Sequence, residues 1–307
     1  MEIKTVAILG AGAIGAYFVW GLEQKLGENL WVVADGERAE RLRSEGLTIN
    51  GRRYALNVRT PAQARGADLL LVATKYGALK GCLPAIAAIA DGHTVVMSLL
   101  NGVSSEDVIA ERIGRAAVLP AFMKIASERR GNEIFFNGET TIGLLYGEAD
   151  SPAPSERMQA IARLLNGTPL HYHMCADIQR QIWYKYALNV SNNLPQAILG
   201  VGVGAYADSE HVAYLSARLR AEVVALAAAK GIDIASPSPS ELGSPAAKRA
   251  RYSTLQDLDA HRRTEVDLFA GAAVEMGRAL GIATPYCDFA LHAIHALEEK
   301  NEGKFDY

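Results

Sequence analysis

The sequence predicts an α/β fold of two domains, in which a parallel sheet with crossover helices comes first and an all-helical domain follows. Short apolar runs rich in valine, isoleucine and leucine recur along the first half of the chain, as is typical of buried parallel strands. Helical patterns separate these runs, and beyond residue 175 long helical patterns dominate. With 307 residues the chain is long enough for two cores. We therefore place the domains at residues 1–175 and 176–307.

The first apolar run, residues 4–9, ends in the motif Gly10-Ala11-Gly12-Ala13-Ile14-Gly15, and a helical stretch follows it. In a G-x-G-x-x-G motif between a strand and a helix, the first glycine makes the tight turn and the second lets backbone N–H groups approach a pyrophosphate. The third lets helix and strand pack closely. The helix N-terminus faces the phosphates with its partial positive charge. The sequence therefore predicts a Rossmann-type domain in which these six residues bind a dinucleotide.

The second apolar run, residues 30–34, is followed directly by Asp35. An acid at this position hydrogen-bonds the adenosine ribose of NAD, whereas a basic residue suits the 2′-phosphate of NADP. Asp35 therefore favours NAD. Arg38 and Arg41 follow closely and are long enough to turn towards a phosphate, so the residues leave the choice within NAD(P)H open.

Two further runs, residues 67–74 and 94–100, are followed by Lys75 and by Asn101-Gly102. Ligands of an open parallel sheet bind beyond the carboxyl ends of its strands. We therefore expect Lys75 and Asn101 to meet the cofactor or the substrate. The alternatives are a surface lysine and a turn residue that supplies left-handed backbone.

The remaining patterns complete the element order. Residues 47–58 predict a hairpin with Asn50-Gly51 as its turn. Further strands are expected at residues 117–123, 133–138, 140–145 and 170–174, with a helix at 155–166. Long helices are expected at residues 176–194, 209–230, 255–280 and 286–301, interrupted by a loop rich in proline and serine at 234–245.

The helical stretch over residues 177–196 carries Lys185, Asn189 and Asn193 at positions i, i+4 and i+8. On a continuous α-helix these side chains share one face, while apolar residues occupy the flanking positions. Asparagine has poor helix propensity, which favours a functional use for two of them here over a solvated face. A polar stripe of this kind suits a ligand whose oxygens need a proton donor and hydrogen-bond donors, and Lys185 is the member that can supply a proton.

Composition excludes several classes of protein. The 31 basic and 34 acidic residues give a net charge of −3, so nothing indicates a nucleic-acid or membrane partner. Glycines interrupt the uncharged stretch over residues 5–22, which argues against a signal peptide. Three widely separated cysteines favour a reducing compartment, and we expect a cytoplasmic protein. The short basic cluster Lys248-Arg249-Ala250-Arg251 is interpreted as a solvated patch.

Histidines supply no convincing metal site. His171 and His173 alternate on a predicted strand, and His292, His295 and Glu298 follow one another at helical spacing. No further ligand clusters with either set in the sequence, so no metal is expected.

Taken together, several short motifs resemble the 2-dehydropantoate 2-reductase (ketopantoate reductase) family over almost the full chain. They are GAGAIGAY at the N-terminus, Lys75 after its strand, Asn101-Gly102, WYKYALNVSNN, S-x-L-Q-D from Ser253, T-E-V-D from Thr264, and Thr284-Pro285-Tyr286.

The resemblance implies NADP-dependent reduction of a 2-keto acid at a cleft between the domains. It implies that Lys185 and Glu265 are catalytic, that Asn189, Asn193 and Ser253 bind the substrate, and that Lys75 and Asn101 lie on the cofactor side. Two positions depart from the family pattern. Asp35 stands where the family usually keeps a basic residue, and Tyr252-Ser253-Thr254 replaces its usual Ser-Ser-Met.

These observations predict reduction of 2-dehydropantoate, or of a closely related 2-keto acid, with Lys185 as general acid. The alternatives are a reductase for another 2-keto or 3-hydroxy acid on the same fold, and a non-catalytic NAD(P) sensor. The substrate is a small molecule in either enzyme. Apolar helical stretches at residues 213–229 and 289–297 leave room for a homodimer interface.

Overall fold

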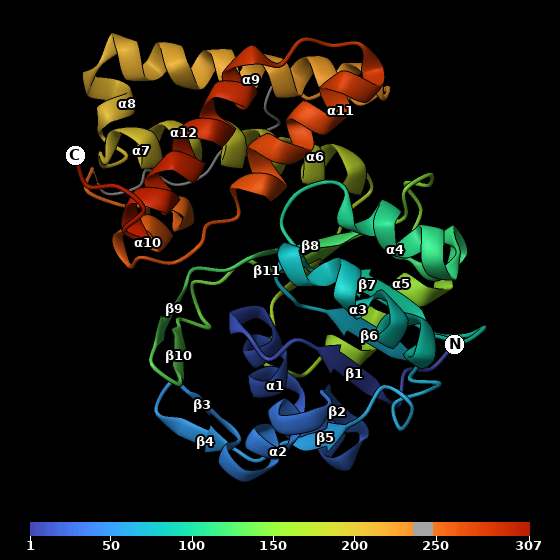
Figure 1. Ribbon diagram of the computed structural model, residues 1–307. Coiled ribbons are helices and arrows are strands. Elements are labelled where there is room, and N and C mark those ends of the chain that lie inside the picture. The colour runs from blue at the N-terminus through green and yellow to red at the C-terminus, as the bar shows by residue number, and fades with distance from the viewer. Residues whose placement is uncertain (236–247) are drawn as a thin grey trace. The chain divides into compact units, whose positions relative to one another are not determined.

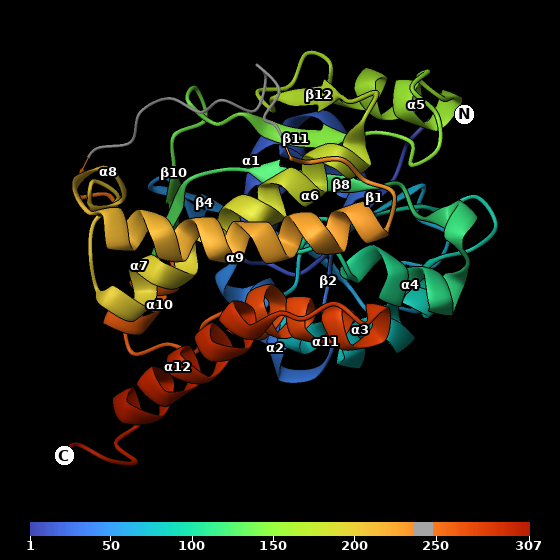
Figure 2. The same ribbon diagram turned by 90° about the horizontal axis from the view of Figure 1, so that it is seen from above.

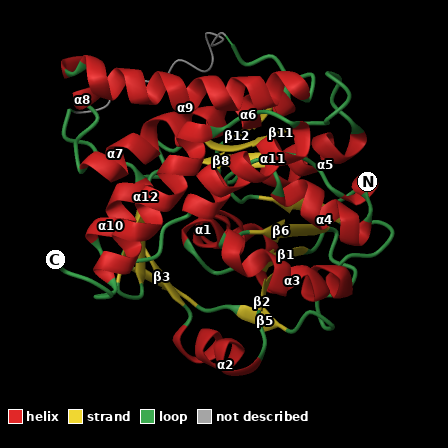
Figure 3. Ribbon diagram, turned by 45° about the horizontal axis from the view of Figure 1, so that its top comes forward, coloured by secondary structure: helices red, strands yellow, loops and turns green. Residues whose placement is uncertain are grey.

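The computed structural model describes residues 1–235 and 248–307, which form two compact units, Met1–Ile178 and Gln179–Tyr307. The boundary predicted at residue 175 lies three residues before this division. Among the described residues, strands occur only in the first unit, and the second unit is built from helices (Figure 3). The loop predicted at residues 234–245 lies almost wholly outside the described residues.

A five-stranded parallel sheet forms the centre of the first unit (Figure 1). Its order is β5 (Asn57–Arg59), β2 (Leu30–Val33), β1 (Val6–Leu9), β6 (Leu69–Val72) and β7 (Val95–Ser98). In the register, Val6 lies opposite Leu30 on one side and Leu69 on the other. The predicted Rossmann-type parallel sheet is confirmed.

Both faces of this sheet are buried, because alternate residues of each strand point to opposite sides. Ile8 packs in one core with Tyr17 and Phe18 of α1 (Ala13–Leu26). Its neighbours along the strand pack in a second core against α3 (Tyr76–Ile89) and α4 (Ser105–Ile113). Continuous apolar strands are therefore required, as the sequence shows.

Two smaller sheets complete the first unit. The order β4 (Arg52–Tyr54), β3 (Leu47–Ile49), β10 (Glu133–Phe136), β9 (Ser127–Arg130) forms one sheet. The order β12 (Tyr172–Met174), β11 (Gly143–Tyr146), β8 (Ala121–Lys124) forms the other. The remaining helices are α2 (Gly36–Glu45), α5 (Glu156–Leu165) and the short 3₁₀ turns Gly27–Asn29 and Arg115–Ala117.

The predicted hairpin is confirmed over residues 47–54, where β3 and β4 pair antiparallel across Asn50 and Gly51. Its predicted end is wrong, because residues 57 and 58 belong to β5 and pair with β2. Both turn residues have positive φ, 48° and 79°, which is the geometry of a type I′ turn. Strand β9 was not predicted. Its residues Ser127 to Arg130 are exposed and polar, so they lack the apolar pattern that marks a strand.

The second unit contains α6 (Ile178–Leu188), a π-helical turn η3 (Asn189–Asn193), α7 (Leu194–Leu199), α8 (Ala205–Asp208), α9 (Glu210–Ala229), α10 (Ser253–Asp259), a second π-helical turn η5 (Asp267–Gly271), α11 (Ala272–Leu280) and α12 (Pro285–Asn301). The long helices α9 and α12 are followed most easily in Figure 2. Helix α9 packs against η3, α11 and α12. No helix in the described part of either unit combines the length and apolar character needed to cross a membrane.

Two predicted helices are not continuous. The stretch predicted at residues 255–280 is wrong as a single helix, because the chain leaves α10 at Asp259 and resumes helical structure only at Val266. His261 has φ of +52°, which an α-helix cannot contain. The stretch predicted at 176–194 changes from α- to π-helix at Asn189.

Candidate active site

The glycine motif has the geometry that its spacing predicts. Gly10 has φ of +117°, and a Cβ there would lie 2.5 Å from the carbonyl oxygen of Ala73. A Cβ on Gly15 would lie 2.0 Å from the carbonyl oxygen of Gly10. Both positions therefore need glycine for the fold itself.

Gly12 differs from its two partners. A Cβ on Gly12 would meet nothing within 4 Å, and its φ of −86° is open to any residue. As the N-cap of α1, Gly12 supplies no side-chain hydrogen bond to the first helical turn. The turn thus has backbone N–H groups without a capping side chain and space in front of them, the combination that a pyrophosphate requires.

Three predicted side chains lie at the same edge of the sheet as Gly12. Asp35, Lys75 and Asn101 follow the carboxyl ends of β2, β6 and β7, on both sides of β1. The strand order changes direction between β1 and β6, and this switch point is where open α/β sheets bind ligands. Asp35 and Lys75 are exposed, and Asn101 is half-buried.

Three buried, hydrogen-bonded side chains flank Asn101 in the sequence: Ser98, Ser105 and Glu106. The hydroxyl oxygens of Ser98 and Ser105 lie 2.7 Å apart, and Ser105 donates to Glu106 at 3.0 Å. Burial of this carboxyl raises the pKa of Glu106 to about 7, against hydrogen bonds that lower it. Glu106 was not among the predicted site residues, although its place four residues after the Asn101-Gly102 turn puts it near the predicted cofactor edge of the sheet.

In the second unit, the helix that carries Lys185 is wider than predicted. Lys185 lies in α6, but Asn189 and Asn193 are the first and last residues of η3. A π-helical turn bonds i to i+5, so the single face deduced from α-helical spacing is wrong beyond Asn189. Lys185 and Asn189 are half-buried, whereas Asn193 is only 5 % exposed.

The local sequence explains the widened turn. Pro195 has no N–H to donate, and its ring crowds the carbonyl four residues earlier, on Ser191. The carbonyl oxygen of Asn192 accepts a hydrogen bond from the Tyr206 hydroxyl, so a partner outside the helix satisfies it. Single π-helical turns of this kind occur frequently at functional sites.

Ser253, the first residue of α10, is held next to this helix by Gln196. The side chain of Gln196 is fully buried; its Oε1 accepts from the Tyr252 backbone N–H at 2.6 Å and its Nε2 donates to the Ala250 carbonyl at 3.2 Å. Helix α10 packs against both η3 and α7. The structure thus brings Ser253 to the helix of Asn189 and Asn193.

Glu265 precedes the second π-helical turn, which packs against the first. The Tyr186 hydroxyl of α6 donates to the Phe269 carbonyl of η5 at 2.6 Å, in a fully buried contact. The segments that carry the five predicted residues of this unit are therefore packed together.

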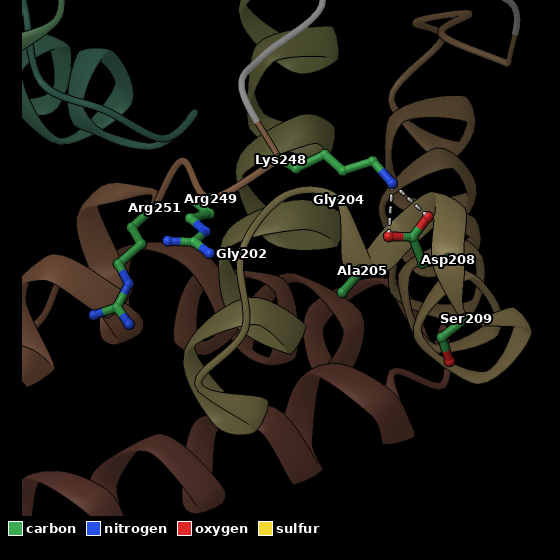
Figure 4. A pocket seen from close by; sticks show the side chains of 8 residues that line it. All are labelled: Gly202, Gly204, Ala205, Asp208, Ser209, Lys248, Arg249 and Arg251. Atoms are coloured by element: carbon green, nitrogen blue, oxygen red, sulfur yellow. Dashed lines mark hydrogen bonds and ion pairs between the residues drawn. The ribbon is translucent and has the colours of Figure 1, made fainter.

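A surface hollow of about 480 Å³ lies elsewhere in the second unit (Figure 4). Lys248 there pairs with both carboxylate oxygens of Asp208 at 3.0 Å. Arg251 pairs with Asp259 on α10. None of the predicted site residues lines the hollow. These ion pairs agree with the interpretation of the basic cluster as a surface patch.

Two models of one protein family match this chain, one in its N-terminal and one in its C-terminal part. Residues 6–147 match the model of the family described as Ketopantoate reductase PanE/ApbA, and residues 177–298 match the model of its C-terminal domain.

Similar proteins align with this chain over nearly its full length. Proteins named 2-dehydropantoate 2-reductase from Archaeoglobus fulgidus and Streptococcus pyogenes serotype M1 are 29 % and 27 % identical. The alignments cover 97 % and 95 % of this chain and 99 % and 97 % of theirs. Among solved structures, a PanE/ApbA family ketopantoate reductase from Ralstonia eutropha has a TM-score of 0.79 at 24 % identity, over 97 % of this chain and 99 % of that one. A D-mandelate dehydrogenase with NADH and anilino(oxo)acetate has a TM-score of 0.80 at 24 % identity, with the same coverage.

Proposed function

The chain belongs to the ketopantoate reductase family of oxidoreductases acting on CH–OH groups, and on that premise we propose that it reduces 2-dehydropantoate, or a closely related 2-keto acid, with NAD(P)H. The observation that carries the proposal is the polar set on one helix: Lys185, then Asn189 and Asn193 at the two ends of a π-helical turn. A non-catalytic dinucleotide sensor would need no such set.

The chemistry assigns a role to each residue. Reduction of a ketone leaves negative charge on the carbonyl oxygen, so the site needs a proton donor and fixed dipoles there. Lys185 donates the proton. Asn189, Asn193 and Ser253 hold the carboxylate and hydroxyl of the acid, and Glu265 orients Lys185 or a substrate hydroxyl.

The first unit supplies the cofactor site. The uncapped helix turn at Gly12 and the open space in front of it fit a pyrophosphate. Lys75 and Asn101 at the neighbouring strand ends would contact the rest of the dinucleotide. When bound, the nicotinamide supplies the hydride.

The identity of the reduced cofactor rests on Asp35. Its side chain is exposed at the end of β2, where it would accept a hydrogen bond from a ribose hydroxyl of NADH and would repel a 2′-phosphate. Asp35 therefore supports NADH, whereas the family resemblance implies NADPH. The D-mandelate dehydrogenase of the same fold is a structure with NADH, and it makes another 2-keto acid a second candidate substrate.

Initial rates of reduced-nicotinamide oxidation with 2-dehydropantoate, measured with NADH and with NADPH at equal concentration, test this proposal. Lys185→Ala should lower kcat by at least about a hundredfold, the low end for general acid catalysis. Its affinity for the cofactor should be unchanged. The exposed Lys230, at the end of α9, gives the control Lys230→Ala. A Lys185→Ala enzyme that kept most of its kcat would remove Lys185 from the mechanism, and binding without turnover on a panel of 2-keto acids would favour the sensor.

A further inference from the structure

Helix α12 carries a carboxylate whose hydrogen bonds converge on the segment before Glu265. The side chain of Glu298 is only 3 % exposed. Its Oε1 accepts from the Thr264 backbone N–H at 2.6 Å and from the Thr264 hydroxyl at 2.8 Å. Its Oε2 accepts from Arg263 and lies 3.0 Å from Nδ1 of His295. A buried carboxylate with so many donors is a fixed point of the structure.

The same cluster reaches the other side of Glu265. Nε2 of His295 lies 3.0 Å from Oδ1 of Asp267, the first residue of η5. Both ring nitrogens therefore face carboxylate oxygens, which accept hydrogen bonds when ionised, so this position favours the doubly protonated imidazolium of His295. The Thr264 hydroxyl also accepts from the Val266 backbone N–H at 3.2 Å. Glu298 therefore hydrogen-bonds Thr264, the residue before Glu265. Through His295 it is also linked to Asp267, two positions after Glu265.

These contacts act on a segment that lies outside regular secondary structure. Residues 262–264 belong to no helix or strand, and the preceding residue, His261, has positive φ. Positions in irregular segments depend on side-chain contacts for their precision.

We propose that Glu298 is a positioning residue for Glu265: its carboxylate fixes Thr264 directly and Asp267 through His295, and so sets where the Glu265 side chain meets the substrate. The inference rests on the substrate-site role proposed above for Glu265. The set His292, His295 and Glu298, considered in the sequence as metal ligands, contains two of the residues involved. Their partners are Thr264, Arg263 and Asp267 rather than His292.

The charges around the cluster make its pH response specific. Partial burial lowers the pKa of His295, but its hydrogen bonds with Glu298 and Asp267 outweigh this and raise the pKa above the ordinary value. Burial raises the pKa of Glu298, and the hydrogen bonds from Thr264, His295 and Arg263 outweigh it and lower the pKa. Two more carboxylates at the C-terminal end of α12 lie near these charges: Glu302 pairs with Arg263, and Glu299, which pairs with Lys304, also interacts with Arg263 and His295. All these hydrogen bonds form while Glu298 is ionised and His295 is protonated. The bonds from His295 to Glu298 and Asp267 weaken as the pH rises through the pKa of His295.

The test is a double-mutant cycle in the full-length enzyme with 2-dehydropantoate as the probe. Glu298→Gln keeps an acceptor for Thr264 and removes the charge that His295 and Arg263 need. It should lower kcat/KM for the keto acid by about tenfold or more, because small misplacements of a positioning group cost up to about a hundredfold. The dissociation constant of the cofactor should not change. In a Glu265→Gln background the same substitution should have little further effect, since its action runs through Glu265.

Two further variants guard against a purely structural effect. Thr264→Val keeps the side-chain shape and removes the hydroxyl bonds to Glu298 and Val266, so it should reproduce the loss in kcat/KM. Glu302→Gln is the matched control, because it removes a second carboxylate from Arg263 but none from Thr264 or His295; it should leave kcat/KM unchanged. The alkaline limb of the keto-acid KM profile that follows His295 should disappear in His295→Gln.

The outcomes separate the two levels of the proposal. Equal losses from Glu298→Gln with and without Glu265 would overturn the positioning role and leave the proposed function intact. A normal kcat/KM in Glu265→Gln would instead overturn the role of Glu265 itself.

Discussion

The sharpest prediction concerns the second glycine of the N-terminal motif. Alanine at Gly12 adds a methyl group that meets no atom of the protein within 4 Å, and its φ of −86° suits any residue. Gly12→Ala should therefore change the free energy of unfolding by no more than about 1 kcal/mol, and a stabilisation is the expected direction. The methyl group would occupy the space through which the pyrophosphate approaches the backbone N–H groups.

The magnitude of the binding effect follows from the hydrogen bonds lost. A bond to a charged partner contributes about 1.5–3 kcal/mol, so losing one weakens cofactor binding by about tenfold to a hundredfold or more. Titration of NADH and of NADPH into the variant, followed by fluorescence or calorimetry, measures this loss. Urea unfolding of the same samples measures stability.

Two other glycines provide the controls. Gly15→Ala places Cβ 2.0 Å from the Gly10 carbonyl oxygen, so it should lose about 1–3 kcal/mol or more of stability, as overpacking does. Gly81→Ala, in α3 with nothing within 4 Å, should gain up to about 1 kcal/mol through helix propensity and leave cofactor affinity unchanged. Unaltered cofactor binding by a folded Gly12→Ala protein would refute the proposed path of the pyrophosphate.

Three further predictions use other parts of the structure. Asp35→Asn removes the acid that follows β2 most closely and would repel a 2′-phosphate, so the ratio of kcat/KM for NADPH to that for NADH should rise by about tenfold, the low end of a like-charge effect; an unchanged ratio would show that Asp35 does not set cofactor choice. Because burial raises the pKa of Glu106 from 4.5 to about 7, the folded protein loses stability as the pH rises through this interval, and Glu106→Gln should abolish the loss, worth up to about 3 kcal/mol. Urea unfolding at pH 5 and pH 8 checks this, and an equal difference between variant and parent at both pH values would contradict it. Tyr186→Phe removes one of two donors to the buried Phe269 carbonyl, which keeps the Ala272 backbone N–H, and should cost about 0.5–1.5 kcal/mol in the same assay; a change near zero would show that the hydroxyl bond adds nothing to stability.

Patterns confined to a few neighbouring residues were sufficient for much of the first unit. The apolar runs predicted the central strands because a strand buried on both faces has no place for polar side chains. The spacing of Gly10, Gly12 and Gly15 predicted a turn whose close contacts the structure shows. Asn50-Gly51 predicted its hairpin for the same reason, since both residues tolerate positive φ.

The tertiary structure decided what depends on partners far along the chain. Periodicity and Pro195 are local features of the helix that carries Asn189 and Asn193, but the Tyr206 hydroxyl, which donates to the Asn192 carbonyl in the π-helical turn, comes from outside this helix. The apolar spacing continues through residues 255–280, yet helix α10 ends at Asp259. In the break that follows, the Thr264 backbone N–H donates to Glu298, 34 residues further along the chain. A buried backbone group pairs with whichever hydrogen-bond partner lies near it in the folded protein. Local sequence spacing does not identify a partner that is distant along the chain. The sequence by itself determined the local elements and the residue types of the candidate site, and the tertiary structure determined how the backbone around those residues is held.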